Sequence, residues 1–318
     1  MTLNITALTP LGVFQVSDRR MTHLWRDGRS YWVDNLNKSL VLACADGLFC
    51  ITFTGIAQIG AQRIDDWLVE TLAARGAAER SCDFAAETIA EAATELFRSV
   101  DPKWEGEHVF TIAGWEKATA NPSIWFIGNG KPPNQRTFVV RRISTRRANQ
   151  AAFFVTGWRQ EKRILLRALR TSKSWEEIQT SLVSALRAAA ENPGPKFISK
   201  DCMAVAISKD SEVVARFYSM NSVSKTLSPD FVWFAGGRNV SLKGMEFTQD
   251  GNYTLFLGGT DVRFLVEPPM NLGAVTAEPG FESKAWVRFD QAVYRDDPLT
   301  DIEFVRITEN DAKPAPTD

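Results

Sequence analysis

The chain has 318 residues, of which 44% are hydrophobic and 24% are charged, and its formal net charge is −1. This composition predicts a soluble globular protein of about two domains, and it excludes a general electrostatic attraction to nucleic acid or to an anionic membrane. The chain contains 2 histidines and 4 widely spaced cysteines, which excludes the common metal motifs and a disulfide framework, so we expect no metal and no cofactor.

The first predicted elements are strands. A short strand, a turn at residues 9–12 and a second strand that ends at the charged cluster around Asp18 open the chain. Two further strands are predicted at residues 38–44 and 48–54. The N-terminus lacks a basic segment followed by an apolar one, and no run reaches transmembrane length, so we expect a cytoplasmic location.

Two helices follow these strands. Gly55 lies at the predicted strand-to-helix turn, and apolar residues at helical spacing then mark a helix that stops at Gly76. Asp83 is expected to cap a second helix. The inward face of this second helix is predicted to carry Phe84, Ile89, Ala93 and Phe97.

The second half of the chain repeats this order. Ser174 and Glu177 form a capping box that opens a helix, and the apolar spacing predicts that Ile178, Leu182 and Ala185 face inward. The other predicted elements are a helix at 161–169 and strands at 109–113, 123–127, 137–143, 151–156, 202–208 and 213–218. This order favours two antiparallel sheets packed face to face with helix pairs outside, which is an α+β, four-layer αββα sandwich.

Residues 221–318 have a different character. Short β-like runs at 231–234, 254–257, 262–266, 284–289 and 302–307 are separated by glycine and proline turns. We therefore predict a first domain at 1–220, a β-rich C-terminal extension at 221–309 and a disordered tail at 310–318.

Chemically active residue types gather in the first forty residues. Thr2 follows Met1, Asp18 ends the second strand, and Lys38 opens the third. A threonine hydroxyl needs a base to become a nucleophile, and a free α-amine, which titrates near ~8, can be that base without histidine. A lysine beside Thr2 would lower the local pKa, and an acid would keep that lysine charged and oriented. The alternative interpretation is an ordinary β-hairpin that ends in a surface ion pair.

The order of these residues resembles the proteasome β-subunit and HslV family of N-terminal-threonine hydrolases. In that family a mature N-terminal threonine opens the first strand, a glycine turn follows, an Asp-x-Arg-x-Thr stretch closes the second strand, and a lysine lies on the next strand. The positions that match are Thr2, Gly12, Asp18, Arg20, Thr22 and Lys38. The lysine comes a few residues later here than in the family, and the resemblance extends over residues 2–75 and, by element order, to about residue 220.

The resemblance implies a catalytic role for several residues. Thr2 would be the nucleophile after removal of Met1, and Lys38 and Asp18 would tune it. The backbone N–H of Gly55 would bind the oxyanion, because an N–H at a helix start suits developing negative charge.

The resemblance also implies supporting residues around that centre. Thr22 would contact the substrate backbone, and Arg20 and Asp201 would be supporting residues, with Asp201 near the position at which the family places a second acidic residue. The serine that the family places after the position of Gly157 is not evident in this chain.

These features predict an N-terminal-threonine amidohydrolase that cleaves a peptide amide and forms a homo-oligomer, with no nucleic-acid and no membrane partner. One alternative is a non-catalytic assembly or binding module on the same fold, which the missing serine and the long C-terminal extension favour. A third interpretation keeps the enzyme but changes the substrate to a small-molecule amide. Loss of Met1 separates the enzymes from the module, because the amine mechanism requires a free N-terminal threonine.

Overall fold

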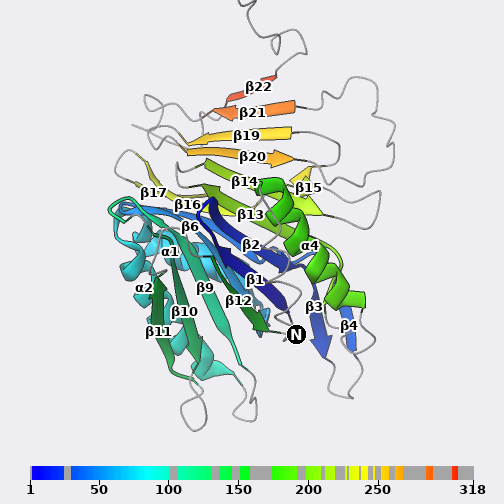
Figure 1. Cartoon of the computed structure of the whole chain (residues 1–318). Helices are drawn as coiled ribbons and strands as arrows, with labels where there is room; N and C mark the ends of the chain where they lie inside the picture. Colours follow the sequence, from blue (N-terminus) through cyan, green and yellow to red (C-terminus); the bar gives the residue numbers. More distant parts are fainter. Residues whose placement is uncertain are drawn as a thin grey trace, which may run out of the picture.

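Two β-sheets packed face to face form the centre of the molecule in the computed structural model (Figure 1). The structure describes residues 2–24, 30–100, 107–119, 121–129, 136–144, 151–157, 174–191, 198–208, 212–218, 226–227, 229–235, 238–242, 246–247, 252–257, 262–267, 284–288 and 303–306. Most elements in this part of the chain are strands, and three α-helices accompany them. The predicted α+β class is thus confirmed as a mixed α and β fold dominated by strands.

The 9-stranded sheet has the order β12-β1-β2-β13-β14-β20-β19-β21-β22. Its strands are β1 (Leu3–Leu8), β2 (Gly12–Asp18), β12 (Ala152–Gly157), β13 (Cys202–Ser208), β14 (Glu212–Tyr218), β19 (Asn252–Leu257), β20 (Val262–Glu267), β21 (Lys284–Arg288) and β22 (Glu303–Arg306). Figure 1 shows β20, β19, β21 and β22 stacked beyond β14, away from the marked N-terminus.

The 7-stranded sheet has the order β11-β10-β9-β6-β5-β16-β17. Its strands are β5 (Ser39–Cys44), β6 (Gly47–Thr54), β9 (Val109–Glu116), β10 (Ser123–Asn129), β11 (Phe138–Ser144), β16 (Asp230–Ala235) and β17 (Arg238–Leu242). Three small two-stranded sheets lie outside the two large ones: β3 (Met21–Leu24) with β4 (Ser30–Val33), β7 (Gln58–Ile59) with β8 (Gln62–Arg63), and β15 (Thr226–Leu227) with β18 (Glu246–Phe247).

The strand pairing corrects the prediction of two wholly antiparallel sheets. Strand β14 pairs with β20 in parallel, β19 pairs with β21 in parallel, and β16 pairs with β5 in parallel. Both sheets therefore continue into strands that come after residue 220 in the chain. The division into a domain at 1–220 and an extension at 221–309 stays a prediction. The predicted helix at 161–169 and the predicted tail at 310–318 lie outside the described residues.

The hairpin of β1 and β2 follows from local sequence. Thr9 closes the turn, because its N–H donates to the Gly12 carbonyl oxygen and the Gly12 N–H donates to the Thr9 carbonyl oxygen. Every residue of both strands is buried. In the antiparallel register Asn4 lies opposite Ser17, which brings the beginning of β1 beside the end of β2.

Helices α1 (Ile64–Ala74) and α2 (Cys82–Leu96) cover one face of the 7-stranded sheet, and short 3-10 helices follow each of them at Ala77–Glu79 and Phe97–Ser99. The predicted cap of α2 is wrong: the Ser81 side chain accepts from the Phe84 N–H. The Asp83 carboxylate instead accepts from the Trp125 indole N–H at 2.6 Å. Phe84 is 38% exposed and does not belong to the inward face.

Helix α4 (Trp175–Glu191) covers the other sheet. The predicted capping residue is confirmed, since the Glu177 N–H donates to Ser174 Oγ at 3.2 Å. The inward face is confirmed as well, with Ile178, Leu182 and Ala185 buried against β1, β2 and β13.

Three apolar clusters fill the spaces between these layers. One joins α1 and α2 to the 7-stranded sheet, one joins the two sheets, and one joins the 9-stranded sheet to α4. The layer between the sheets has a second, polar part near the start of β1. Its buried side chains are Asn4, Thr6, Gln15, Ser17, Ser39, Thr52 and Thr111. No helix in the described part of the chain is both long and apolar enough to cross a membrane.

Candidate active site

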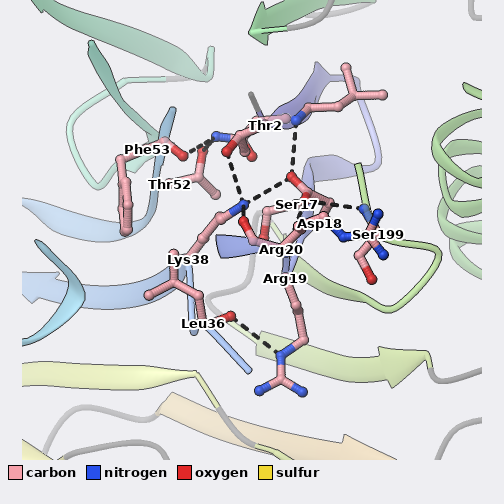
Figure 2. Close-up of polar contacts among 12 residues, drawn as sticks. Thr2, Ser17, Asp18, Arg19, Arg20, Leu36, Lys38, Thr52, Phe53 and Ser199 are labelled. Atoms are coloured by element: carbon pink, nitrogen blue, oxygen red, sulfur yellow. Dashed lines mark hydrogen bonds and ion pairs between the residues drawn. The ribbon is translucent and has the colours of Figure 1, made fainter. Parts of the chain in front are cut away.

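Thr2 lies directly before β1 and is 5% exposed. Its hydroxyl oxygen accepts a hydrogen bond from Lys38 Nζ at 2.9 Å (Figure 2). Lys38 is the residue directly before β5, which belongs to the opposite sheet. The two side chains therefore meet at one end of the layer between the sheets. The structure thus brings together two residues that are separated by the whole β1–β2 hairpin and the β3–β4 hairpin.

Lys38 is 2% exposed and donates to three oxygen atoms. These are Thr2 Oγ1 at 2.9 Å, Asp18 Oδ1 at 3.1 Å and the Arg20 carbonyl oxygen at 2.8 Å. An ammonium group has three N–H donors. Each donor of Lys38 therefore has a defined acceptor, and the side chain is fixed in one orientation.

Asp18 is the last residue of β2 and has no exposed surface. One carboxylate oxygen accepts from Lys38 Nζ and from the Leu3 N–H at 3.0 Å. The other accepts from the Arg20 N–H at 3.0 Å and from the Ser199 N–H at 3.4 Å. These bonds compensate the cost of burying the carboxylate, and the bond to Leu3 ties Asp18 to the residue that follows Thr2.

The protonation of Lys38 decides what this arrangement can do. Burial lowers the pKa of Lys38, and the opposing attraction of Asp18 does not fully offset that effect. A carboxylate oxygen and a carbonyl oxygen can only accept, so Asp18 and Arg20 need an N–H of Lys38 in either state. When Lys38 loses a proton, its lone pair must therefore face Thr2 Oγ1. The same nitrogen can donate to the threonine oxygen or accept the threonine proton.

Arg20 contributes to this centre through its backbone. Its N–H donates to Asp18 and its carbonyl oxygen accepts from Lys38. Its guanidinium points elsewhere, pairing with both carboxylate oxygens of Asp34 at 2.8 and 2.9 Å and lying over the Trp32 ring at 5.2 Å. The side chain thereby anchors the β3–β4 hairpin.

Gly157 is a site residue that the sequence did not identify. It ends β12 opposite Leu3, and a Cβ atom at this position would overlap the Thr2 carbonyl oxygen. Its φ of +85° is also a conformation that favours glycine. In the sequence, Gly157 ends a predicted strand and precedes the position at which the family places a serine, but no role was assigned to the glycine itself.

Ser199 is a second residue that the sequence did not identify. Its N–H donates to Asp18, and its hydroxyl accepts from the Asp201 N–H at 3.0 Å. The Asp201 carbonyl oxygen in turn accepts from the Arg19 N–H at 3.1 Å. The pairing of β13 with β2 sets Cys202 opposite Asp18 and explains why these residues lie here. Asp201 thus joins the site through its backbone.

Thr22 lies on β3, opposite Trp32. Its hydroxyl is buried and has no hydrogen-bond partner among the residues that the structure describes. The predicted contact of Thr22 with a substrate stays a prediction.

The prediction for Gly55 is wrong in one respect. Gly55 follows β6 with a φ of +111°, but the chain then forms the β7–β8 hairpin, and α1 begins only at Ile64. The N–H of Gly55 therefore does not lie at a helix start, and the helix dipole gives no reason for an anion to bind there. Its role as an oxyanion donor stays a prediction.

Potential metal ligands do not gather in the part of the chain that the structure describes, where no group of three or more His, Cys, Asp and Glu side chains is placed to hold an ion.

Comparisons with known proteins return structures but no sequence families. No family model matches the chain, and no curated protein matches it. Among solved structures, Anbu (ancestral beta-subunit) from Yersinia bercovieri has a TM-score of 0.45 and 11% identity over 64% of this chain and 81% of that chain. Anbu from Hyphomicrobium sp. strain MC1 has a TM-score of 0.44 and 15% identity over 65% and 82%. A structure described as the helical assembly of the Anbu complex from Pseudomonas aeruginosa has a TM-score of 0.46 and 13% identity over 68% and 85%.

These comparisons correct the family suggested by the sequence. The three structures named above are Anbu proteins, and no family model supports placing the chain with proteasome β-subunits and HslV. Similarity at this level assigns neither a family nor an activity to the chain.

Proposed function

We propose that the chain is an N-terminal-threonine amidohydrolase that cleaves a peptide amide bond. The observation that carries the proposal is the hydrogen bond of 2.9 Å between Lys38 Nζ and Thr2 Oγ1. Because the other two bonds of Lys38 go to atoms that only accept, the lysine is set to exchange a proton with this one hydroxyl. An ion pair between Lys38 and Asp18 with a purely structural role would not require a hydrogen bond from Lys38 to Thr2.

In the first step, Thr2 Oγ attacks the carbonyl carbon of the substrate and loses its proton. The proton passes to neutral Lys38, or to the α-amine that removal of Met1 would expose. The oxyanion that forms would take a hydrogen bond from the Gly55 N–H. The carbon–nitrogen bond then breaks, and the leaving amine takes the proton. Water hydrolyses the resulting ester, which releases the acid and restores the Thr2 hydroxyl.

The neighbouring residues would orient the groups that react. Asp18 and the Arg20 carbonyl oxygen fix the orientation of Lys38, and Thr22 would bind the substrate backbone. The alternative substrate, a small-molecule amide, uses the same steps.

The finer description of the fold belongs to the same proposal. We assign the layers described above to a four-layer αββα sandwich at residues 1–220, with a β-rich extension at 221–309, and we expect the chain to form a homo-oligomer. The sandwich is supported by the three apolar clusters, because each cluster fills the space between two successive layers in the order helices, sheet, sheet, helix.

The cysteines leave Thr2 without a competing thiolate nucleophile. Cys44, Cys50, Cys82 and Cys202 are all buried and free. Burial raises the pKa of each thiol, and that of Cys202 reaches about 12. A buried thiol of this kind is inert toward electrophiles at neutral pH.

The test is covalent labelling of the full chain with an epoxyketone, which closes a ring only on a hydroxyl and an α-amine carried by adjacent carbons. The protein is purified from its native host, and its intact mass is measured first. We expect the mass to show loss of Met1 and the reagent to modify Thr2 alone. Thr2→Ala should abolish labelling, and Lys38→Ala should slow it strongly.

Cys50→Ala is the matched control and should label at the wild-type rate. A retained Met1 would rule out the amine mechanism. Labelling that persists in Thr2→Ala would show that the nucleophile is a different residue. A protein that begins at Thr2 and does not react would support the non-catalytic module.

A further inference from the structure

The turn after β6 is pressed against the residues that lead into β9. A Cβ atom at Gly55 would lie 2.7 Å from the Glu107 carbonyl oxygen, 2.7 Å from His108 Nδ1 and 2.9 Å from His108 Cα. Real Cβ atoms do not approach other atoms so closely. No side chain fits at Gly55 unless His108 and its backbone move, so the position of the turn depends on the position of His108.

The His108 ring occupies a fixed place in the core. It has no exposed surface, and four phenylalanines surround it at centroid distances of 4.6 to 6.0 Å: Phe53, Phe97, Phe110 and Phe138. Its backbone is held by Asn129, whose side-chain oxygen accepts from the His108 N–H at 2.6 Å and whose N–H donates to the His108 carbonyl oxygen at 3.2 Å.

One ring nitrogen reaches the turn. The Ile56 N–H donates to His108 Nδ1 at 3.1 Å. A nitrogen that accepts a hydrogen bond carries no proton, so the bond assigns the proton of the neutral ring to Nε2. Burial lowers the pKa of His108 to about 3, so the ring is neutral at physiological pH and keeps its lone pair on Nδ1.

The same turn borders the candidate active site. Thr54 precedes Gly55, and its methyl carbon would lie 3.3 Å from a Cβ atom at Gly157. Gly157 in turn packs against the carbonyl group of Thr2. Thr54 and Gly157 therefore connect the turn to the backbone of Thr2.

We propose that His108 is a positioning residue, whose Nδ1 holds the Ile56 N–H and thereby fixes the Gly55–Ile56 turn beside Thr2. The imidazole acts here as a hydrogen-bond acceptor and not as an acid or a base. Its effect on catalysis rests on the proposed function, whereas its effect on the turn does not.

The test compares His108→Asn with His108→Leu in the full chain. The Asn side-chain oxygen can replace Nδ1 as an acceptor, whereas Leu keeps a similar volume without an acceptor. We expect hydrogen exchange of the Ile56 amide to be about two- to tenfold faster in His108→Leu than in wild type, corrected for global stability, and near wild type in His108→Asn. The epoxyketone labelling rate should fall in the same order, with the reagent's binding constant unchanged.

Phe138→Leu is the matched control, because it alters the wall around the ring but keeps the bond to Ile56. It should leave both the corrected exchange rate and the labelling rate unchanged. Wild-type exchange of Ile56 in a folded His108→Leu protein would overturn the proposal. If hydrogen exchange at Ile56 follows the expected order but the epoxyketone does not label the wild-type protein, the proposed function is overturned and the role of His108 in the turn is not.

The tautomer supplies a measurement that needs no variant. The 15N chemical shifts of the His108 ring in wild type should show an unprotonated Nδ1 and a protonated Nε2. A proton on Nδ1 would overturn the proposal even if neither variant folds.

Discussion

Lys38 and His108 are two buried bases on opposite sides of the 7-stranded sheet, and their surroundings differ completely. Lys38 meets a carboxylate, a carbonyl oxygen and a hydroxyl, while His108 meets four phenylalanine rings and one backbone N–H. A buried charge is tolerated only where partners compensate it. Lys38 has such partners and can therefore be protonated or neutral at its position. The His108 imidazole has no counter-ion among the residues that the structure describes and is therefore confined to the neutral form. The first environment suits proton exchange and the second suits a fixed acceptor.

Removal of Lys38 should have the largest effect. Lys38→Ala leaves the fully buried Asp18 without its counter-ion, and the free energy of unfolding should fall by about 3–5 kcal/mol. Urea denaturation measures this change. Lys200→Ala breaks the exposed pair with Glu191 and is the matched control, which should leave the midpoint unchanged. Equal midpoints in the two variants would mean that Asp18 does not depend on the lysine.

Lowering the pH should reduce the stability of the protein through His108. The pKa of His108 is lowered from 6.5 to about 3 by burial, so the unfolded chain binds a proton in this interval that the folded chain does not. Stability from this residue is present above pH 6.5 and is lost as the pH falls toward 3, by up to a few kcal/mol.

The His108 contribution is the difference between wild type and His108→Asn, measured by denaturation from pH 7 to pH 4. Both proteins share the carboxylates, so the wild-type curve should fall more steeply. Parallel curves would contradict a buried neutral imidazole.

Two glycines with positive φ separate backbone strain from contact with Thr2. Gly60 has a φ of +60°, and a Cβ atom placed on it would meet no described atom within 4 Å, so Gly60→Ala should cost only the left-handed backbone penalty of about 1–2 kcal/mol. Gly157→Ala adds a collision with the Thr2 carbonyl group and should destabilise more and slow Thr2 labelling. Thermal melts and labelling rates of both variants check this. Identical behaviour would show that Gly157 does not position Thr2.

The smallest effect is expected at Ser17 and Ser39, whose hydroxyl oxygens lie 2.9 Å apart between the sheets beside Asp18 and Lys38. A double-mutant cycle with Ser17→Ala and Ser39→Ala should give a coupling energy of about 0.5–1.5 kcal/mol. A coupling energy of zero would show that the hydrogen bond between Ser17 and Ser39 does not stabilise the structure beside Lys38.

Local sequence explains the placement of Asp18, whereas the Lys38 position, which lies before β5 of the opposite sheet, was indicated by the order of residues that the resemblance rests on. Turn residues at Thr9 and Gly12 fix the register of β1 and β2, so Asp18 must lie beside Leu3. The positions of Gly157 and Ser199 depend on β12 and β13, which join this hairpin from distant parts of the chain. No local pattern encodes such a pairing, and for that reason these residues were missed.

The same distinction explains the errors in the fold. Apolar spacing predicts α1 and α4 because their stripes face a sheet, and it fails at Gly55, where two-residue strands too short to show a period precede α1. The parallel pairs were missed because strand periodicity carries no information on direction.

The parallel pairing of β16 with β5 and of β20 with β14 has a consequence for biosynthesis. A ribosome that has released only residues 1–220 presents β5 and β14 with unpaired backbone groups along one side. Such open margins recruit strands from other molecules. A chain truncated at residue 220 should therefore aggregate rather than accumulate as a smaller folded protein, and the nascent chain should need a chaperone until residue 267 has emerged.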